Sequence, residues 1–455
     1  MKKSMKSVIC LLAAMLLSAG CGSVSDNIIL TVNVLEPSAN EVVIVCHNDV
    51  KTFPLDADGK AEVVLDGMEA AYARLFYGRE FRWIYAEAGD RASVNFNGRD
   101  FVNTFVFEGE KGPAVKYLNN VRLTALPDED YALPFTEYRE RLSARENDAL
   151  KLMKAAGLGK AGDFEHMEEG RIRYAYAAPL LMHPVGHRMM TGNMSYVPDE
   201  AYYDVIGSYM VEDRDWVNLD EYRNFVVEAA HVLDAENREV TAPYPRTVAQ
   251  MRFIADRFKS PEVRDVLLHH LAASYVFQYG IDDIQEMENI YLTYVQDTAL
   301  LADYGRKHEK WELSKPGKVS PDFRAVDIDG KEWTLADFRG RYVYIDMWAT
   351  WCSPCKREMP YLKELEKDFH DAEIVFLGLS TDRDKTKWEE MVKSGALTGV
   401  QLYLGPRSTF QKAYNIDGIP RFILLDKEGR IISNDMSRPS SDETAKTLNS
   451  LEGIR

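Results

Sequence analysis

The sequence predicts a multidomain protein with an N-terminal antiparallel β-sandwich, a central all-α region and a C-terminal α/β domain. The chain has 455 residues, of which 46% are hydrophobic, and that is enough for about three folded domains. Short β-branched runs fill the first part of the chain, and long amphipathic stretches fill the middle. The last part contains an apolar strand that leads into a helix. We therefore expect domains at residues 21–112, 113–313 and 314–455.

Residues 1–20 predict an export signal. Met1–Lys6 is positively charged, Val8–Leu17 is apolar, and Ser18-Ala-Gly-Cys21 follows. The apolar run is too short to span a bilayer as a helix, and the order of the segments is typical of a secretion signal. The ending resembles bacterial lipoprotein precursors, which implies cleavage before Cys21 and lipidation of that cysteine. The alternative is an ordinary signal peptide that leaves Cys21 as a free thiol.

Short β-branched runs separated by turn residues predict the strands of the β-sandwich. The runs are Ile28–Val34, Glu41–Val45, Lys60–Leu65, Ala71–Phe76, Arg82–Ala86, Arg91–Phe96 and Thr104–Phe107. Cys46 ends one apolar run, so we expect it to be a small buried hydrophobic residue.

Long periodic stretches predict the helices of the central region. They are Tyr138–Ala156, Phe164–Ala178, Asp199–Met210, Leu219–Leu233, Val248–Phe258, Pro261–Gln278 and Ile284–Tyr304. Their recurring aromatic residues indicate helix packing, and we expect no cofactor. His183 and His187 have the spacing of metal ligands, but Pro184 and Gly186 argue against a regular helix there, and we expect no metal site.

Cys352 and Cys355 stand three residues apart where an apolar strand becomes a helix. Tyr342–Ile345 predicts a buried strand, Trp348–Trp351 a turn, and Pro354 the first turn of a helix, where its missing N–H costs nothing. Cys352 is then near the helix N-cap, where free N–H groups and the helix dipole favour a thiolate. Cysteines in such motifs have pKa values of about 3.5–7.5, below the usual 8.5. Cys355 shares a helix face with Cys352 and can form a disulfide with it.

The run Asp346–Pro360 resembles thioredoxin, with an Asp six residues before the first Cys, a Trp directly before it, a Pro within the pair and a Pro five residues after the second Cys. Residues 414–430 resemble the thioredoxin segment that carries a cis-proline, which makes Pro420 the candidate. Ser320–Phe323 and Asp327–Gly340 resemble the entry hairpin of membrane-tethered TlpA/ResA-like proteins.

The resemblance implies a thioredoxin-like fold and thiol-disulfide oxidoreductase activity through a mixed disulfide. Cys352, the more exposed thiol, would attack the client disulfide, and Cys355 would resolve the intermediate. Trp351, Ile419 and Pro420 would contact the client.

Two acidic residues have expected roles in proton transfer. Asp346 interrupts an apolar strand, and the resemblance makes it the acceptor of the proton of Cys355. Glu358 matches the glutamate that TlpA/ResA-like proteins carry three residues after the second Cys, which implies a second proton-handling group. The alternative is a solvated Glu358 that pairs with Lys356 or Arg357.

The resemblance leaves the direction of electron flow open between reduction, oxidation and isomerisation. Asp346 is often absent from the ResA branch, and Ser353 fills a variable position that tunes the redox potential. Ala86–Asp90 and Phe107–Gly109 resemble an N-terminal domain of unknown function that precedes thioredoxin modules in envelope lipoproteins. That domain could bind clients, dimerise or act as a spacer.

Other functions remain as alternatives. A scaffold or client-binding lipoprotein would use its upstream domains and keep the thioredoxin module as an accessory. A peroxiredoxin-like peroxidase would need a Pro-x-x-x-Thr/Ser lead before its cysteine, and Thr350 and Trp351 do not supply it. A structural disulfide or half a zinc site is a further alternative. The zinc site would need a second cysteine or histidine pair at ligand spacing, and none follows in the sequence. An exported chain with so few cysteines is also not typical of a disulfide scaffold.

The net charge of −17 argues against nucleic acid and against electrostatic docking on anionic lipid. The expected partners are disulfide-bearing envelope proteins and a membrane donor of thiol equivalents. We expect a periplasm-facing protein held to the membrane of the cell envelope by its lipid.

Overall fold

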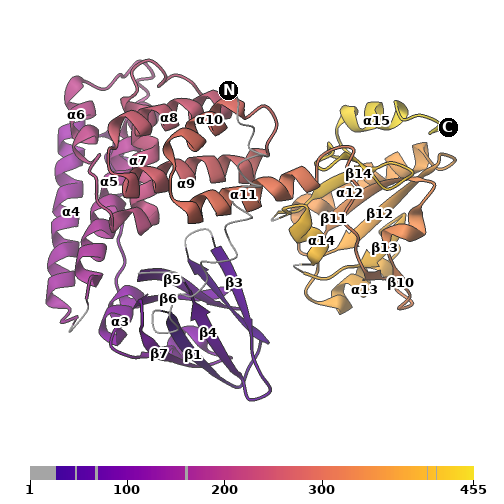
Figure 1. Cartoon of the computed structure of the whole chain (residues 1–455), viewed down its shortest axis with the longest axis horizontal. Helices are drawn as coiled ribbons and strands as arrows, with labels where there is room; N and C mark the ends of the chain where they lie inside the picture. The colour runs from indigo at the N-terminus through magenta and orange to yellow at the C-terminus, as the bar shows by residue number, and fades with distance from the viewer. Residues whose placement is uncertain are drawn as a thin grey trace. The chain divides into compact units, whose positions relative to one another are not determined.

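The computed structural model describes residues 27–46, 49–66, 70–158, 162–406, 408–416 and 418–454. Cys21 and the expected signal peptide lie outside these ranges. The chain forms two compact units, one of Met1–Ala272 with Gln285–Leu301 and one of Ala273–Ile284 with Ala302–Arg455. Figure 1 shows the elements of both units. Among the described helices, none combines the length and the apolar character that a membrane span requires.

The first unit begins with two four-stranded sheets, ordered β4-β1-β7-β8 and β3-β2-β5-β6. Their strands are β1 (Ile28–Leu35), β2 (Glu41–Cys46), β3 (Asp49–Pro54), β4 (Lys60–Leu65), β5 (Ala70–Tyr77), β6 (Glu80–Glu87), β7 (Arg91–Asn97) and β8 (Val106–Glu108). Alternate residues of β1 are buried, as a sheet with one core-facing side requires. Cys46 is buried in this core, as expected.

One strand pair departs from the expected antiparallel arrangement, because β1 and β7 run parallel. A parallel pair needs a long crossover, and the strands between β1 and β7 in the sequence provide it. The sequence pattern also does not reveal β3, where Lys51 and Thr52 interrupt the apolar residues and Phe53 is the residue that packs against the core.

The helices between residues 101 and 313 are α2 (Phe101–Thr104), α3 (Gly112–Asn120), α4 (Phe135–Ala155), α5 (Phe164–Thr191), α6 (Glu200–Ser208), α7 (Asp220–Leu233), α8 (Pro243–Arg257), α9 (Pro261–Tyr279), α10 (Gln285–Tyr294) and α11 (Thr298–Leu313), with 3₁₀ turns at Asp128–Ala132 and Trp216–Asn218. The helices α4 to α11 are where the periodic stretches predict them, with different ends, whereas α2 and α3 match no predicted helix, and the strand expected at Thr104–Phe107 is β8 (Val106–Glu108). The stretch expected as one helix at Ile284–Tyr304 is two helices. Asp265 accepts hydrogen bonds from the N–H groups of Gln296 and Asp297 at the break between them.

The expectation that Pro184 prevents a regular helix is wrong, because α5 continues through Pro179 and Pro184. Proline costs a helix one hydrogen bond and a steric clash, and here tertiary contacts hold the helix. His183 is fully buried, its Nε2 lies 3.0 Å from the carbonyl of Leu133, and His187 Nδ1 lies 2.9 Å from that of Tyr131.

The second unit contains a seven-stranded sheet ordered β10-β9-β13-β12-β11-β14-β15. Its elements are β9 (Ala325–Val326), β10 (Glu332–Trp333), a 3₁₀ turn (Leu335–Phe338), β11 (Tyr342–Trp348), α12 (Ser353–Asp368), β12 (Ile374–Ser380), α13 (Lys385–Lys393), β13 (Val400–Tyr403), α14 (Thr409–Ala413), β14 (Arg421–Leu425), β15 (Ile431–Ser433) and α15 (Asp442–Asn449). β9 and β10 form the expected entry hairpin. β11 lies between the parallel strand β12 and the antiparallel strand β14.

Every residue of β11 is buried, because helices cover both faces of the sheet (Figure 1). Val343, Ile345 and Met347 pack in one core with residues of α14. Tyr342 and Tyr344 pack in the other core with residues of α12. Since side chains alternate along a strand, Asp346 and Trp348 lie on the face that α12 covers.

Candidate active site

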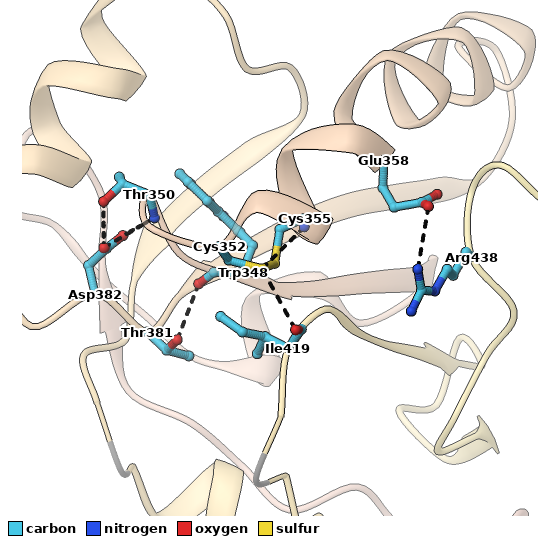
Figure 2. The surroundings of a disulfide bond; sticks show 9 residues. All are labelled: Trp348, Thr350, Cys352, Cys355, Glu358, Thr381, Asp382, Ile419 and Arg438. Atoms are coloured by element: carbon cyan, nitrogen blue, oxygen red, sulfur yellow. Dashed lines mark hydrogen bonds and ion pairs between the residues drawn. A yellow bond between two sulfur atoms is a disulfide. The ribbon is translucent and has the colours of Figure 1, made fainter. Parts of the chain in front are cut away.

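Cys352 and Cys355 form a disulfide at the first turn of α12 (Figure 2), with their Cα atoms 5.3 Å apart. Cys352 is the N-cap residue, and its Sγ accepts a hydrogen bond of 3.1 Å from the backbone N–H of Cys355. Pro354 fits the first turn, as its missing N–H predicts. When the pair is reduced, this N–H and the helix dipole favour the thiolate of Cys352.

The two cysteines do not differ in exposure in this disulfide state, contrary to expectation. Cys352 is 3% exposed and Cys355 is 2% exposed. The reason is local packing, because both lie in one apolar cluster with Trp348 and Trp388. Trp351, by contrast, directly precedes Cys352 and is 61% exposed.

Ile419 and Pro420 lie beside the disulfide. The peptide bond between them is cis, as the sequence predicts for Pro420. The carbonyl oxygen of Ile419 lies 3.7 Å from Cys352 Sγ. The structure therefore brings Cys352, Ile419 and Pro420 together at the end of the sheet where β11 ends and β14 begins.

Asp346 is a buried carboxyl group on β11. It is 6% exposed, and its Oδ1 has no hydrogen-bond partner among the described residues. Burial raises the pKa of Asp346 to about 7, and the negative charges of Glu358 and Glu366 add to the increase. A group with this pKa is about half protonated at pH 7, so it can both accept and release a proton.

Glu358 is not the solvated residue of the alternative expectation. It is 7% exposed, and its carboxylate accepts hydrogen bonds from the N–H of Ser440 at 3.0 Å and the hydroxyl of Ser440 at 3.1 Å. Arg438 Nη1 lies 3.9 Å from Glu358 Oε1 as an ion-pair partner (Figure 2). The partners of Glu358 are thus in the segment before α15, and the charge of Glu358 raises the pKa of Asp346.

Asp382 holds the turn that carries Cys352, and the sequence patterns do not single it out for this role. The Asp382 carboxylate accepts hydrogen bonds from the N–H of Thr350 at 2.9 Å, the hydroxyl of Thr350 at 2.7 Å and the hydroxyl of Ser380 at 2.8 Å. Asp382 is 1% exposed. The N–H of Thr381 donates to the carbonyl of Trp348 at 2.9 Å, and the hydroxyl of Thr381 lies 3.3 Å from the same carbonyl (Figure 2). The residues that follow β12 therefore hold both Trp348 and Thr350 in place.

The signal that could have revealed Asp382 is an acid two residues after the end of an apolar strand. Asp382 does not cap the following helix, because the N-cap of α13 is Asp384, whose side chain accepts a hydrogen bond from the N–H of Thr386.

Within the described part of the chain, one group of side chains has the spacing of metal ligands. His166 Nε2 lies 3.2 Å from Asp213 Oδ2 and 3.7 Å from Asp215 Oδ2. The three residues are half-exposed and belong to the first unit. A histidine–carboxylate ion pair explains these distances as well as a metal site does.

Comparisons with known proteins match the second unit. Residues 315–451 match the Redoxin family model. The ResA thiol-disulfide oxidoreductase of Bacillus thuringiensis is 30% identical to the chain over 149 residues, which are 33% of this chain and 84% of the relative. The ResA of Geobacillus kaustophilus is also 30% identical, over 135 residues, which are 29% of this chain and 77% of the relative. A putative thiol-disulfide oxidoreductase from Bacteroides vulgatus, solved in solution, is 49% identical over 31% of this chain and 94% of its own, with a TM-score of 0.29. The chain belongs, through this C-terminal region, to the ResA family of thiol-disulfide oxidoreductases.

Proposed function

We propose that the Cys352–Cys355 pair reduces disulfides of client proteins in the cell envelope through a mixed disulfide. The observation that carries this proposal is the position of Cys352. Its sulfur caps α12, a position that favours the thiolate. The same sulfur lies 3.7 Å from the carbonyl of Ile419, where the backbone can pair with a client.

The reduced Cys352–Cys355 pair supplies the two electrons and two protons that turn one client disulfide into two thiols. The Cys352 thiolate attacks one sulfur of the client disulfide, and the other client sulfur leaves as a thiolate and takes up a proton. Cys355 then loses its proton, and its thiolate attacks Cys352 Sγ. The mixed disulfide breaks, the second client thiolate takes up a proton, and the Cys352–Cys355 disulfide forms.

Asp346 is the proposed acceptor of the Cys355 proton, since its pKa of about 7 suits transfer near neutral pH. Glu358 supports this role through its charge, which raises the pKa of Asp346. Ser440 and Arg438 hold the Glu358 carboxylate, and its proposed second role is to handle protons near the cysteine pair.

Trp351, Ile419 and Pro420 are the proposed client contacts. The exposed indole of Trp351 offers apolar surface beside the reactive sulfur. The N–H and carbonyl groups near the cis peptide offer pairing for an extended client backbone.

The location of the protein is part of the proposal. The segment before Cys21 supports export and lipid anchoring at Cys21, with a membrane donor of thiol equivalents as the source of electrons. The β-sandwich at residues 21–112 and the helical region at 113–313 would then present the module at 314–455 to clients in the envelope.

The direction of the reaction follows from the reduction potential of the pair. We expect a value of about −270 mV, as in thioredoxin, rather than about −120 mV, as in a strong oxidant. The test equilibrates the full mature chain with glutathione buffers and measures turnover of a model protein disulfide. A reduced protein that does not cleave the disulfide, or a potential near the oxidant value, contradicts the proposal.

A further inference from the structure

Asp346, Gly378 and Gln401 form a row across three neighbouring strands. Asp346 on β11 is in register with Gly378 on β12, and Gly378 is in register with Gln401 on β13. A Cβ atom on Gly378 would overlap the side-chain amide of Gln401. Because Gly378 has no side chain, the side-chain amide of Gln401 can lie over β12, on the same face of the sheet as Asp346.

A small cavity lies at this row. Asp346 and Gln401 line it together with Thr398, and Ala396, an exposed residue, lies where it meets the surface. The space open to the centre of a water molecule is about 10 Å³, which fits one water. Neither Cys352 nor Ile419 is among the described residues that line the cavity, so the cavity is separate from the proposed client contacts.

Two buried acceptors border this cavity without a donor. Asp346 Oδ1 and Gln401 Oε1 have no hydrogen-bond partner among the described residues. The amide nitrogen of Gln401 donates to the carbonyl of Thr398 at 2.6 Å, and this fixes the orientation of the amide. A buried acceptor without a partner costs about 1–3 kcal/mol. One water has two donors and can satisfy both oxygens.

A second carboxyl group lies beside Thr398, one of the residues that line the cavity. Glu366 on α12 is half-buried and hydrogen-bonds Thr398, and burial raises its pKa above the usual value. Its Oε1 lies 2.7 Å from the position that a Cβ on Gly399 would take. Glu366 is half-exposed, so it can exchange protons with bulk water, and its hydrogen bond to Thr398 keeps it next to the cavity.

We propose that one water held between Asp346 and Gln401 connects the Asp346 carboxyl to solvent past Thr398 and Glu366. The proposal rests on the proposed function, in which Asp346 takes the Cys355 proton. The S–H bond of Cys355 breaks and an O–H bond forms on Asp346. Asp346 then passes its proton to the water, and the water passes one of its own to Glu366 or to solvent. Asp346 returns to the carboxylate before the next turnover.

The charged and titratable groups around Asp346 are few. Glu358 and Glu366 face it from α12, and Tyr344 is its neighbour on the same face of β11. Lys363 acts on Glu366. The row itself contributes the uncharged Gly378 and Gln401 from β12 and β13, so the carboxyl groups of α12 set the local charge.

The test is multiple-turnover reduction of a model disulfide by the full chain between pH 5 and pH 9, with a small dithiol in excess as the reductant, because Asp346 then has to release its proton in every turnover. We expect Gln401→Leu to slow the reaction about tenfold near pH 7, less than the 10²–10⁴ that loss of a proton-transfer group itself costs. The loss should shrink as the pH rises, because hydroxide then deprotonates Cys355 directly. Glu366→Gln should slow the reaction and move its pH midpoint down, because a like charge near Asp346 is removed. Glu364→Gln, an exposed change on the same helix, is the matched control and should leave the profile unchanged.

The outcomes separate the two proposals. A wild-type chain that reduces the disulfide, with Gln401→Leu and Glu366→Gln variants that follow its pH profile, overturns the water path and leaves the proposed function intact. A wild-type chain that does not reduce the disulfide overturns both. A second measurement does not depend on how the variants fold, since a high-resolution crystal structure should show one water in hydrogen-bond range of Asp346 Oδ1 and Gln401 Oε1. A dry cavity there overturns the path.

Discussion

The carboxylate of Asp382 binds both the backbone N–H and the hydroxyl of Thr350, at 2.9 Å and 2.7 Å. Thr350 lies two residues before Cys352 in the turn between β11 and α12. The buried acid that follows β12 therefore positions the turn that carries Cys352, the proposed attacking cysteine.

Replacing Asp382 by Ala should destabilise the protein and slow its reaction with disulfides. The change leaves the buried hydroxyl of Ser380 and the half-buried donors of Thr350 without this acceptor, and an unsatisfied buried donor costs about 1–3 kcal/mol. Denaturant unfolding and alkylation of Cys352 measure the two effects. Asp384→Ala is the matched control, since loss of the α13 N-cap costs about 1 kcal/mol and leaves the turn in place. If Asp382→Ala alkylates at the wild-type rate, Asp382 does not position Cys352.

Asp346→Asn should remove a pH dependence of stability. The pKa of Asp346 is about 7 in the folded protein and about 3.9 in an unfolded chain. The folded state binds more protons between these values, so wild-type stability should fall as the pH rises from about 4 to about 7.

The Asn variant cannot ionise at this position, so at pH 8 it should be more stable than the wild type by a few kcal/mol, since each pKa unit corresponds to about 1.4 kcal/mol. Urea unfolding at pH 5 and pH 8 measures this difference. Equal stability of the two proteins at pH 8 contradicts the raised pKa. The same variant should resolve mixed disulfides slowly at pH 7, because Cys355 loses its proton acceptor.

Glu358→Gln should lower the pKa of Asp346. The charge of Glu358 is the strongest contribution to that pKa after burial, and Gln keeps an acceptor for Ser440. Carbon-13 NMR titration of the Asp346 carboxyl measures the change. An unchanged titration midpoint shows that the Glu358 charge does not reach Asp346, and Glu364→Gln again provides the exposed control.

Trp351→Ala should weaken client binding without unfolding the protein. The side chain is 61% exposed, so its loss removes little buried surface and the melting temperature should stay near that of the wild type. The KM for a protein disulfide should rise several-fold, while the reduction potential is kept. Tyr361→Ala on α12, 54% exposed, is the comparison and should change neither quantity. A wild-type KM for Trp351→Ala removes Trp351 from the client contacts.

Local rules were sufficient to predict the reactive turn. Pro354 and the apolar strand before Cys352 place the cysteine at a helix N-cap, and the structure has it there. The cis bond before Pro420 followed from a resemblance and is also present. In both cases neighbouring residues contain the information.

The features that the sequence did not reveal depend on contacts between distant residues. The role of Asp382 comes from Thr350, which is 32 residues away in the chain. The course of α5 through Pro184 depends on the burial of His183 against residues before α4. The partners of Glu358 come from the segment before α15. No local pattern contains such pairings, because the fold creates them.

The central claim is that Cys352 attacks the client and Cys355 resolves the intermediate. Trapping of mixed disulfides in cells, with the full-length Cys355→Ser and Cys352→Ser variants compared by mass spectrometry, tests it most directly. We expect Cys355→Ser to accumulate adducts joined through Cys352, and Cys352→Ser to accumulate none. Adducts joined through Cys355 in the Cys352→Ser variant, together with none in Cys355→Ser, would contradict the assignment.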